Sequence, residues 1–135
     1  MKNNPIGIFD SGIGGLTVAN AIKNVVPNED IIYFGDTEHL PYGEKSRESI
    51  LRFSKNIIRF LINKDCKAIV IACNSASSVM NDNLLKYANN KIVFNVIDPV
   101  AKLAVELAND FKSSAGKTLE VGVIGTKATI GSEIY

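Results

Sequence analysis

The stretch IVIACNSAS (residues 69–77) combines the features that decide the fold of this chain. Four apolar residues, Ile69 to Ala72, run directly into Cys73, and the small polar residues Asn74 and Ser75 follow. A short apolar run bounded by a polar turn is typical of a buried strand in a parallel sheet. The stretch therefore predicts a strand that ends at a turn into a helix, with a thiol at the turn.

Apolar runs of the same kind recur along the chain and alternate with helical patterns. Strands are predicted over residues 6–9, 31–34, 68–72, 92–97 and 119–125. Helices are predicted over residues 16–26, 48–64, 77–88 and 98–111, the last with Asp98 as N-cap and Pro99 at its first position. Near-continuous apolar strands between amphipathic helices predict an α/β fold, a parallel sheet flanked by helices on both faces.

The composition narrows the class of protein. The 135 residues are enough for one domain, or for one domain and part of another, and 46% of them are hydrophobic. The 15 basic and 14 acidic side chains leave a net charge of +1 without a block of either sign, which argues against nucleic acid or a membrane surface as a partner. No apolar stretch approaches the roughly 20 residues of a membrane span. The first ten residues also lack the apolar run of a signal peptide, so a cytoplasmic protein is expected.

Small polar and ionisable residues follow four of the predicted strands. Ligands of open α/β sheets bind at the carboxyl ends of the strands, so these residues are expected to share one rim. They are Asp10-Ser11-Gly12, Gly35-Asp36-Thr37, Cys73-Asn74-Ser75 and Gly125-Thr126. Each group alone could equally form a turn or a helix cap. Their convergence on one rim predicts a binding site.

The turn DSGIGG (residues 10–15) follows a strand and precedes a helix, as a phosphate-binding loop does. However, its spacing differs from G-x-G-x-x-G, no G-K-[ST] follows, and the charge of Asp10 would repel a phosphate. A nucleotide site is therefore disfavoured. The glycines are expected instead to let the backbone approach a small ligand, with helix N–H groups directed at a carboxylate.

The two cysteines flank the third predicted strand and are expected to differ in role. Seven steps of about 3.3 Å separate Cys66 from Cys73 by roughly 23 Å, whereas a disulfide needs Cα atoms within about 7 Å. Cys73 lies just past the apolar run, at the start of a helix whose dipole would lower the pKa of its thiol. This position suits a base or a nucleophile, whereas Cys66 is expected to be structural.

His39 is the only histidine and lies in the loop DTEHLPYGEKS (residues 36–46). The loop could bring it beside Cys73, as in a Cys–His hydrolase, although a histidine on a surface loop is the simpler interpretation. No pair of residues has the spacing of metal ligands, so no metal is expected.

Five motifs carry a resemblance to a known family. They are GIFDSGIGGLTV (7–18), FGDTEHLPYGEKS (34–46), IACNSAS (71–77), NVIDP (95–99) and GTKATIGS (125–132). In order and spacing they resemble glutamate racemase, of the aspartate/glutamate racemase group, over essentially the whole chain. The resemblance implies two similar α/β domains with the site in the cleft between them. It also implies interconversion of L- and D-glutamate without a cofactor, which supplies D-glutamate for bacterial peptidoglycan.

The resemblance also assigns roles to residues. The family uses two cysteines on opposite faces of the substrate Cα, one as a thiolate that removes the α-proton and one as a thiol that delivers a proton. By resemblance, Cys73 is the cysteine that acts on D-glutamate, and Asp10 positions or deprotonates it. The residues implied to contact the substrate are Asp10, Ser11, Tyr42, Gly43, Asn74, Ser75 and Thr126, the last holding the substrate carboxylate. A weakly acidic α-proton indeed requires a poised base and donors for the charge that develops.

The chain departs from the family pattern at two places. Ser75 stands where the family has Thr, which keeps the hydroxyl group, and the chain stops before the GCTH-like stretch that carries the second cysteine. Residues 1–97 are therefore expected to form most of the first domain, without its C-terminal return segment. Residues 98–135 are expected to begin a second domain that is truncated.

Several alternatives stay open from the sequence. The substrate could be aspartate or another acidic amino acid, because residues outside this chain also set the length of side chain accepted. The chain could instead be a catalytically inactive fragment that binds a small dicarboxylate, or nothing. A nucleotide-binding module would require a phosphate loop that the sequence lacks. The oligomeric state, a homodimer included, is left open.

Overall fold

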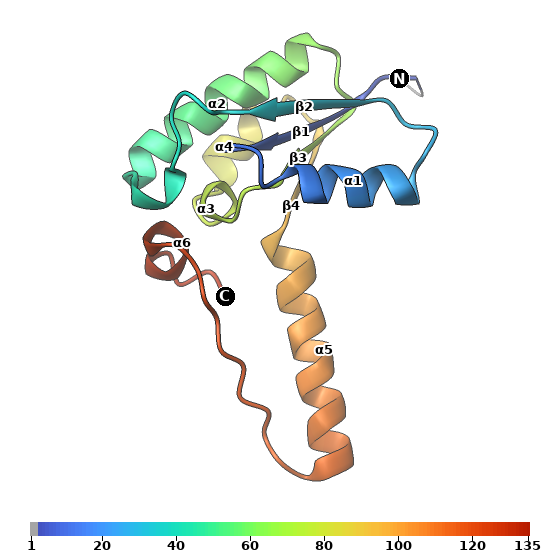
Figure 1. Cartoon of the computed structure of the whole chain (residues 1–135), viewed down its shortest axis with the longest axis vertical. Coiled ribbons are helices and arrows are strands. Elements are labelled where there is room, and N and C mark those ends of the chain that lie inside the picture. The colour runs from blue at the N-terminus through green and yellow to red at the C-terminus, as the bar shows by residue number, and fades with distance from the viewer. Residues whose placement is uncertain (1–2) are drawn as a thin grey trace.

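The computed structural model describes residues 3–135, which form a four-stranded sheet, helices around it and one long helix that leaves it (Figure 1). The strands are β1 (Ile6–Asp10), β2 (Ile31–Gly35), β3 (Ala68–Ile71) and β4 (Ile92–Asn95). The helices are α1 (Leu16–Val25), the short 3-10 helix η1 (Tyr42–Glu44), α2 (Arg47–Asn63), α3 (Asn74–Ser77), α4 (Asp82–Lys86), α5 (Ile97–Ala115) and α6 (Lys127–Gly131). The α/β class and the first four predicted strands are confirmed.

The sheet is parallel throughout, with the strands in the order β2-β1-β3-β4. Ile8 of β1 pairs with Tyr33 of β2 on one side and with Val70 of β3 on the other. Since the strands run in one direction, their carboxyl ends meet at one edge of the sheet. The residues that follow β1, β2 and β3 therefore share that edge, as predicted.

The two faces of the sheet pack against different helices. On one face, β1 and β3 pack with α2 and α4 in the larger core, which includes Phe9, Leu61 and Ile71. On the other face, α1 packs against the sheet, where Ala19 and Ile8 belong to a smaller core. Burial of a large apolar side chain contributes about 1.5–3 kcal/mol, so this packing holds the sheet edge in place.

Two helix starts differ from the prediction because asparagine side chains cap the helices. The helix predicted over residues 77–88 is two short helices, α3 and α4. Asn81 between them has an extended backbone, and its side chain accepts a hydrogen bond from the backbone N–H of Leu84. Asp98 does not cap α5, because Oδ1 of Asn95 accepts the backbone N–H groups of both Ile97 and Asp98 at 2.8 Å. A side-chain acceptor of this kind begins a helix where the first N–H groups lack partners.

The segment from α5 to residue 125, called the arm below, projects away from the sheet (Figure 1). The prediction of a fifth strand over residues 119–125 is wrong. This part of the arm is irregular and pairs with no strand among residues 3–135. A strand needs a neighbour for its backbone N–H and C=O groups, and within the described residues this segment has none. α5 has 19 residues, but no helix in residues 3–135 has both the length and the apolar character to cross a membrane.

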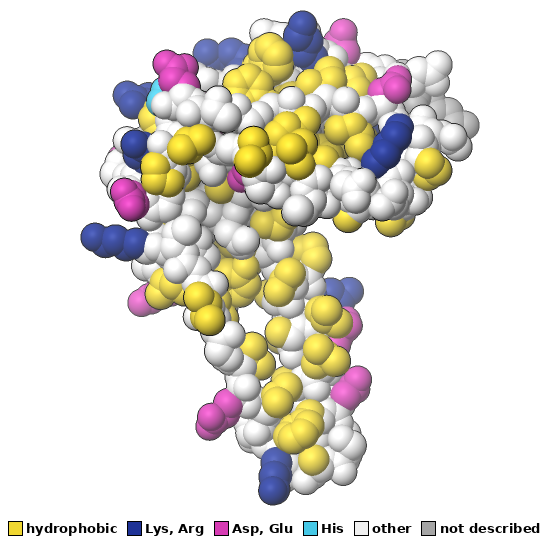
Figure 2. Space-filling view, viewed as in Figure 1, with side chains coloured by type: hydrophobic (Ala, Val, Ile, Leu, Met, Phe, Trp, Pro, Cys, Tyr) yellow, Lys and Arg dark blue, Asp and Glu magenta, His cyan; other side chains and the backbone are white. Residues whose placement is uncertain are grey.

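Apolar side chains are exposed along the arm (Figure 2). They include Leu103, Leu107, Val121 and Ile124. Contiguous exposed apolar surface is rare on monomeric proteins and favours association. We therefore predict that the chain binds a hydrophobic dye and self-associates.

A pair of charged substitutions on the arm tests this prediction. Leu103→Lys with Ile124→Lys should lower dye fluorescence and shift sedimentation toward the monomer. The control is Val25→Lys on α1, a position that is also exposed but lies outside the arm. A wild-type chain that sediments as a sharp monomer and binds no dye contradicts the prediction.

Candidate functional site

Asp10, Ser11 and Cys73 come together at the carboxyl edge of the sheet. Asp10 ends β1, and Cys73 follows β3, the neighbouring strand. Both side chains are buried, with 7% of Asp10 and 6% of Cys73 exposed. The thiol of Cys73 donates to the hydroxyl oxygen of Ser11 at 3.6 Å, and the Ser11 hydroxyl makes a long contact of 3.5 Å to Oδ1 of Asp10. The three side chains thus form a row from thiol to hydroxyl to carboxylate.

The glycine-rich turn after β1 folds around the carboxylate of Asp10. Oδ2 of Asp10 accepts the backbone N–H groups of Gly15 at 3.0 Å and Gly12 at 3.2 Å. A Cβ atom at Gly15 would lie 2.7 Å from Cβ of Asp10, so only glycine allows this approach. The expectation that these N–H groups face the carboxylate of a ligand is therefore wrong for Gly12 and Gly15, because the carboxylate of Asp10 occupies them. An anion already in this place also disfavours a bound phosphate.

The sulfur of Cys73 is set at the start of α3. Its Sγ accepts the backbone N–H of Ala76 at 3.4 Å, so the cysteine caps the helix through its sulfur. Burial nevertheless raises the pKa of the Cys73 thiol, although the N–H of Ala76 and the contacts with Ser11 lower it; the charge of Asp10 raises it further. The helix start therefore acts in the expected direction through the N–H of Ala76, but burial outweighs it and the pKa of Cys73 is raised overall. α3 has only four residues and aligns few peptide dipoles.

The raised pKa predicts the pH dependence of alkylation by iodoacetamide. Only the thiolate reacts, so Cys73 in the folded chain should react more slowly than an ordinary thiol at pH 8 and accelerate as the pH rises beyond about 8.5. Burial also raises the pKa of Cys66. Mass spectrometry of the two cysteine peptides measures each rate separately, and the urea-unfolded chain gives the reference. Equal rates for Cys73 in folded and unfolded chains contradict the prediction.

The raised pKa of Cys73 also determines how the stability of the folded chain changes with pH. Because folding favours the neutral thiol, this contribution to stability is fully present below the unfolded pKa. It is lost as the pH rises through the folded pKa, so the free energy of unfolding should fall at alkaline pH.

Thr126 returns to the rim from the far end of the chain. It caps α6, which packs against η1 and α3. Its hydroxyl oxygen lies 2.9 Å from the hydroxyl oxygen of Ser75, although 51 residues separate the two in sequence. A Cβ atom at Gly43 would lie 2.6 Å from Cβ of Thr126. Gly43, Ser75 and Thr126 therefore form one tight contact. The strand-end pattern placed Ser75 and Thr126 at one rim, although the fifth strand it assumed does not form, and Gly43 was expected from the resemblance alone.

Asn74 lies at the outer side of this contact. Its side chain is exposed, and its Oδ1 accepts the hydroxyl group of Tyr135 at 2.7 Å. Asn74 therefore lies at the same rim as Cys73 and Ser75 while remaining open to solvent.

Tyr42 and His39 share one partner, the buried carboxylate of Asp36. The hydroxyl of Tyr42 donates to Oδ2 of Asp36 at 2.5 Å, and Nδ1 of His39 lies 2.8 Å from Oδ1. The hydroxyl of Tyr42 is therefore engaged within the protein. His39 makes no hydrogen bond to Cys73 in the described chain, so the geometry gives no support to a Cys–His hydrolase.

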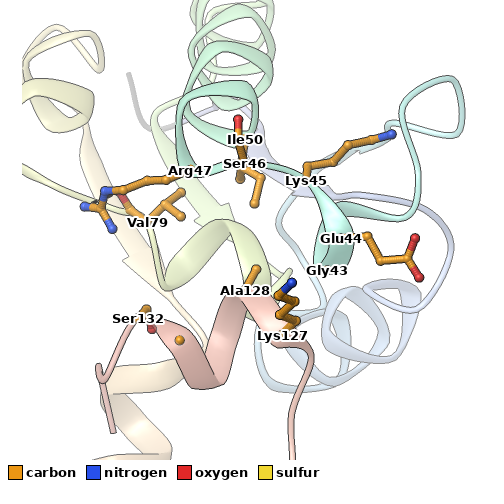
Figure 3. A pocket seen from close by; sticks show the side chains of 11 residues that line it. Gly43, Glu44, Lys45, Ser46, Arg47, Ile50, Val79, Lys127, Ala128 and Ser132 are labelled. Atoms are coloured by element: carbon orange, nitrogen blue, oxygen red, sulfur yellow. Dashed lines mark hydrogen bonds between the residues drawn. The ribbon is translucent and has the colours of Figure 1, made fainter.

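A hollow of about 460 Å³ lies beside the rim, between α6 and the start of α2 (Figure 3). Gly43 is the one predicted site residue in its wall. The wall also carries Lys45, Arg47 and Lys127. Figure 3 shows the charged ends of Lys45 and Arg47 extending away from each other on opposite sides. Lys45 and Arg47 therefore do not converge on a single anion.

The sequence placed Asp36 at the rim but assigned it no individual role at the site. It appeared at the end of the second strand, and its backbone N–H donates to the carbonyl of Asp10 at 2.9 Å. Its position beside Asp10, at the ends of two neighbouring strands, was the feature of the sequence that could have indicated a role for it. Cys66 is fully buried in the larger core, consistent with a structural thiol. Within residues 3–135, no group of three or more His, Cys, Asp or Glu side chains could hold a metal ion.

Comparison with known proteins finds close similarity in sequence. No family model matches the chain. It is 47% identical over all 135 residues to the glutamate racemase of Corynebacterium kroppenstedtii, of which it covers 44%. It is 43% identical over the same length to the glutamate racemase of Lactococcus lactis subsp. lactis, of which it covers 46%. The chain thus spans a little under half the length of these curated relatives.

The chain is also similar to solved structures of glutamate racemases, again over about half of their length. The crystal structure of glutamate racemase from Francisella tularensis in complex with D-glutamate matches the whole chain with a TM-score of 0.87 and 44% identity. The chain covers 47% of that protein. Glutamate racemase from Aquifex pyrophilus matches 95% of the chain with a TM-score of 0.85 and 44% identity. The fold is therefore that of the aspartate/glutamate racemases.

Proposed function

We propose, from the premise that this chain belongs with the glutamate racemases in sequence and in fold, that it supplies the base that removes the α-proton of D-glutamate. The observation that carries the proposal is the row formed by the Cys73 thiol, the Ser11 hydroxyl and the Asp10 carboxylate. Every member of the row can accept or pass a proton.

The chemistry needs Cys73 as a thiolate. The thiol proton leaves through Ser11 toward Asp10, and the ammonium group of the bound amino acid favours the negative charge on sulfur. The thiolate then takes the α-hydrogen as a proton, and the electron pair of the C–H bond passes into the α-carboxylate. Return of a proton from Cys73 regenerates D-glutamate, whereas a proton from the opposite face yields L-glutamate. The reaction as proposed uses no cofactor.

The substrate carboxylates would be held by the polar groups around Cys73. Ser75, Thr126 and the exposed side chain of Asn74 offer hydroxyl and amide donors. Gly43, the residue after Tyr42 in η1, lies against Thr126 and closes the same side. Such donors stabilise the charge that develops on the α-carboxylate as the proton leaves.

The wider role is part of the same proposal. Residues 1–97 would form most of a first domain and residues 98–135 the start of a second, a division that the departure of α5 from the sheet at Ile97 supports. The product, D-glutamate, would serve peptidoglycan synthesis in the cytoplasm.

A titration with D-glutamate tests the proposal. In ¹H–¹⁵N spectra of the chain, D-glutamate should shift the amide signals of Ser11, Asn74, Ser75 and Thr126 in a saturable way. D-Aspartate is the matched competitor, being one methylene shorter, and should bind more weakly. Tighter binding of D-aspartate favours the aspartate alternative. Absence of any shift with either amino acid overturns the proposal for this chain.

A further inference from the structure

The carboxylate of Asp36 joins two side chains of the loop that follows β2. The hydroxyl of Tyr42 donates to Oδ2, and Nδ1 of His39 lies 2.8 Å from Oδ1 and 3.0 Å from Oδ2. Since a carboxylate accepts and does not donate, Nδ1 of His39 carries the hydrogen. One carboxylate thus accepts from a tyrosine and a histidine of its own loop.

Burial and packing make this arrangement rigid. Asp36 is 6% exposed and Tyr42 is 1% exposed. The ring of His39 stacks on Phe53 of α2 with a centroid separation of 4.0 Å, and the ring of Tyr42 lies 5.6 Å from the same phenylalanine. Burial raises the pKa of the Tyr42 hydroxyl, and its hydrogen bond to Asp36 raises it further, so the group stays protonated as a donor.

The loop that Asp36 holds through Tyr42 and His39 forms one wall of the proposed site. Tyr42 begins η1, and Gly43 is the next residue. Gly43 lies so close to Thr126 that no Cβ atom fits between them, and Thr126 in turn contacts the hydroxyl of Ser75. A shift of η1 toward α6 therefore moves Thr126 relative to Ser75.

We infer that Asp36 is a positioning residue for the reaction, which holds η1 through Tyr42 and His39 and so sets the place of Thr126 at the site. This inference rests on the proposed function for its effect on substrate, but its effect on geometry can be measured without substrate. Asp36 itself touches neither Cys73 nor Thr126 by a hydrogen bond in residues 3–135, and it acts through the loop.

Replacement by asparagine separates this role from a general loss of packing. Asn has nearly the shape of Asp but only one acceptor oxygen, and its NH₂ group would face a donor. Either Tyr42 or His39 therefore loses its partner, and η1 is released. Glu38→Gln is the matched control, because it makes the same change of carboxylate to amide on an exposed residue of the same loop.

The experiment uses the full chain and three readouts. A ¹⁵N spectrum of the single histidine reports which ring nitrogen carries the hydrogen. The nuclear Overhauser effect between the Hα atoms of Gly43 and the methyl group of Thr126 reports their contact. A titration with D-glutamate reports affinity. In the wild type and in Glu38→Gln we expect hydrogen on Nδ1, a strong Overhauser effect and equal affinity.

In Asp36→Asn we expect the Overhauser effect to weaken and the affinity for D-glutamate to fall about tenfold, the equivalent of one lost buried hydrogen bond. His39→Ala, which removes a partly exposed ring, is the second variant if Asp36→Asn does not fold. It should likewise weaken the Overhauser effect and lower the affinity for D-glutamate. An intact Overhauser effect with unchanged affinity in a folded variant overturns the inference, even if the variant is less stable.

The two proposals fail in distinguishable ways. If the wild-type chain binds no D-glutamate, the proposed function and the effect of Asp36 on substrate are both overturned. The Overhauser effect then still decides whether Asp36 holds Gly43 against Thr126.

Discussion

Cys73→Ala is expected to lower the rate at which this chain exchanges the α-proton of D-glutamate by about 10²- to 10⁴-fold, the usual contribution of a positioned base. Removal of the sulfur leaves Ser11 and Asp10 in place but deletes the group that faces the α-proton. The loss should appear in the rate constant at saturating D-glutamate more than in affinity, because the carboxylate contacts proposed for Ser75 and Thr126 remain. Exchange in D₂O, followed by the α-proton signal, measures the rate.

Cys66→Ala is the matched control for this substitution. Cys66 is the only other cysteine and is fully buried at the opposite end of β3. Its loss should cost about 1 kcal/mol of stability and leave exchange unchanged. Equal rates of α-proton exchange in Cys73→Ala and Cys66→Ala would show that Cys73 takes no part in the reaction.

Gly43→Val is expected to produce the second large effect. A Cβ atom at residue 43 would lie 2.6 Å from Cβ and 2.7 Å from Cγ2 of Thr126, so the branched side chain must push α6 away. Thr126 then loses its contact with Ser75. Overpacking of this kind costs about 1–3 kcal/mol of stability. Displacement of a substrate contact by about 1 Å can lower a rate by about 100-fold, so exchange should fall by that order.

Gly122→Val makes the same substitution where it should have no effect. A Cβ atom at Gly122 meets no other atom within 4 Å, and the residue lies on the arm. Urea unfolding separates the stability change from the change in exchange. If Gly43→Val exchanges D-glutamate as fast as Gly122→Val, the contact between Gly43 and Thr126 has no part in the site.

The sheet could be predicted from the sequence because each of its strands is an apolar run between polar turns. β1 to β4 begin and end within two residues of the runs that predicted them. The run over residues 119–125 has the same pattern and forms no strand. The difference lies in neighbours, since a strand needs a partner that no local pattern supplies.

The site could be predicted in part. The rule that ligands meet the carboxyl ends of parallel strands placed Asp10, Ser11 and Cys73 together. The strand-end rule also placed Thr126 at the rim with Ser75, but through a fifth strand that does not form, and their approach depends instead on how α6 packs after the arm.

Three features depended on burial and on single hydrogen bonds, which the sequence does not display. They are the occupation of the glycine-turn N–H groups by Asp10, the raised pKa of Cys73 and the network around Asp36. Each involves a polar group whose partner is fixed by packing rather than by spacing along the chain.

The central claim is that Cys73 acts as a base on one face of glutamate, and comparison of the two enantiomers tests it most directly. The wild-type chain is incubated in D₂O with D-glutamate or L-glutamate, and the α-proton signal is followed by NMR. The account predicts that D-glutamate loses this signal and L-glutamate keeps it, since the chain presents one thiol at the site. Loss of signal from neither enantiomer, or from both at the same rate, would contradict it.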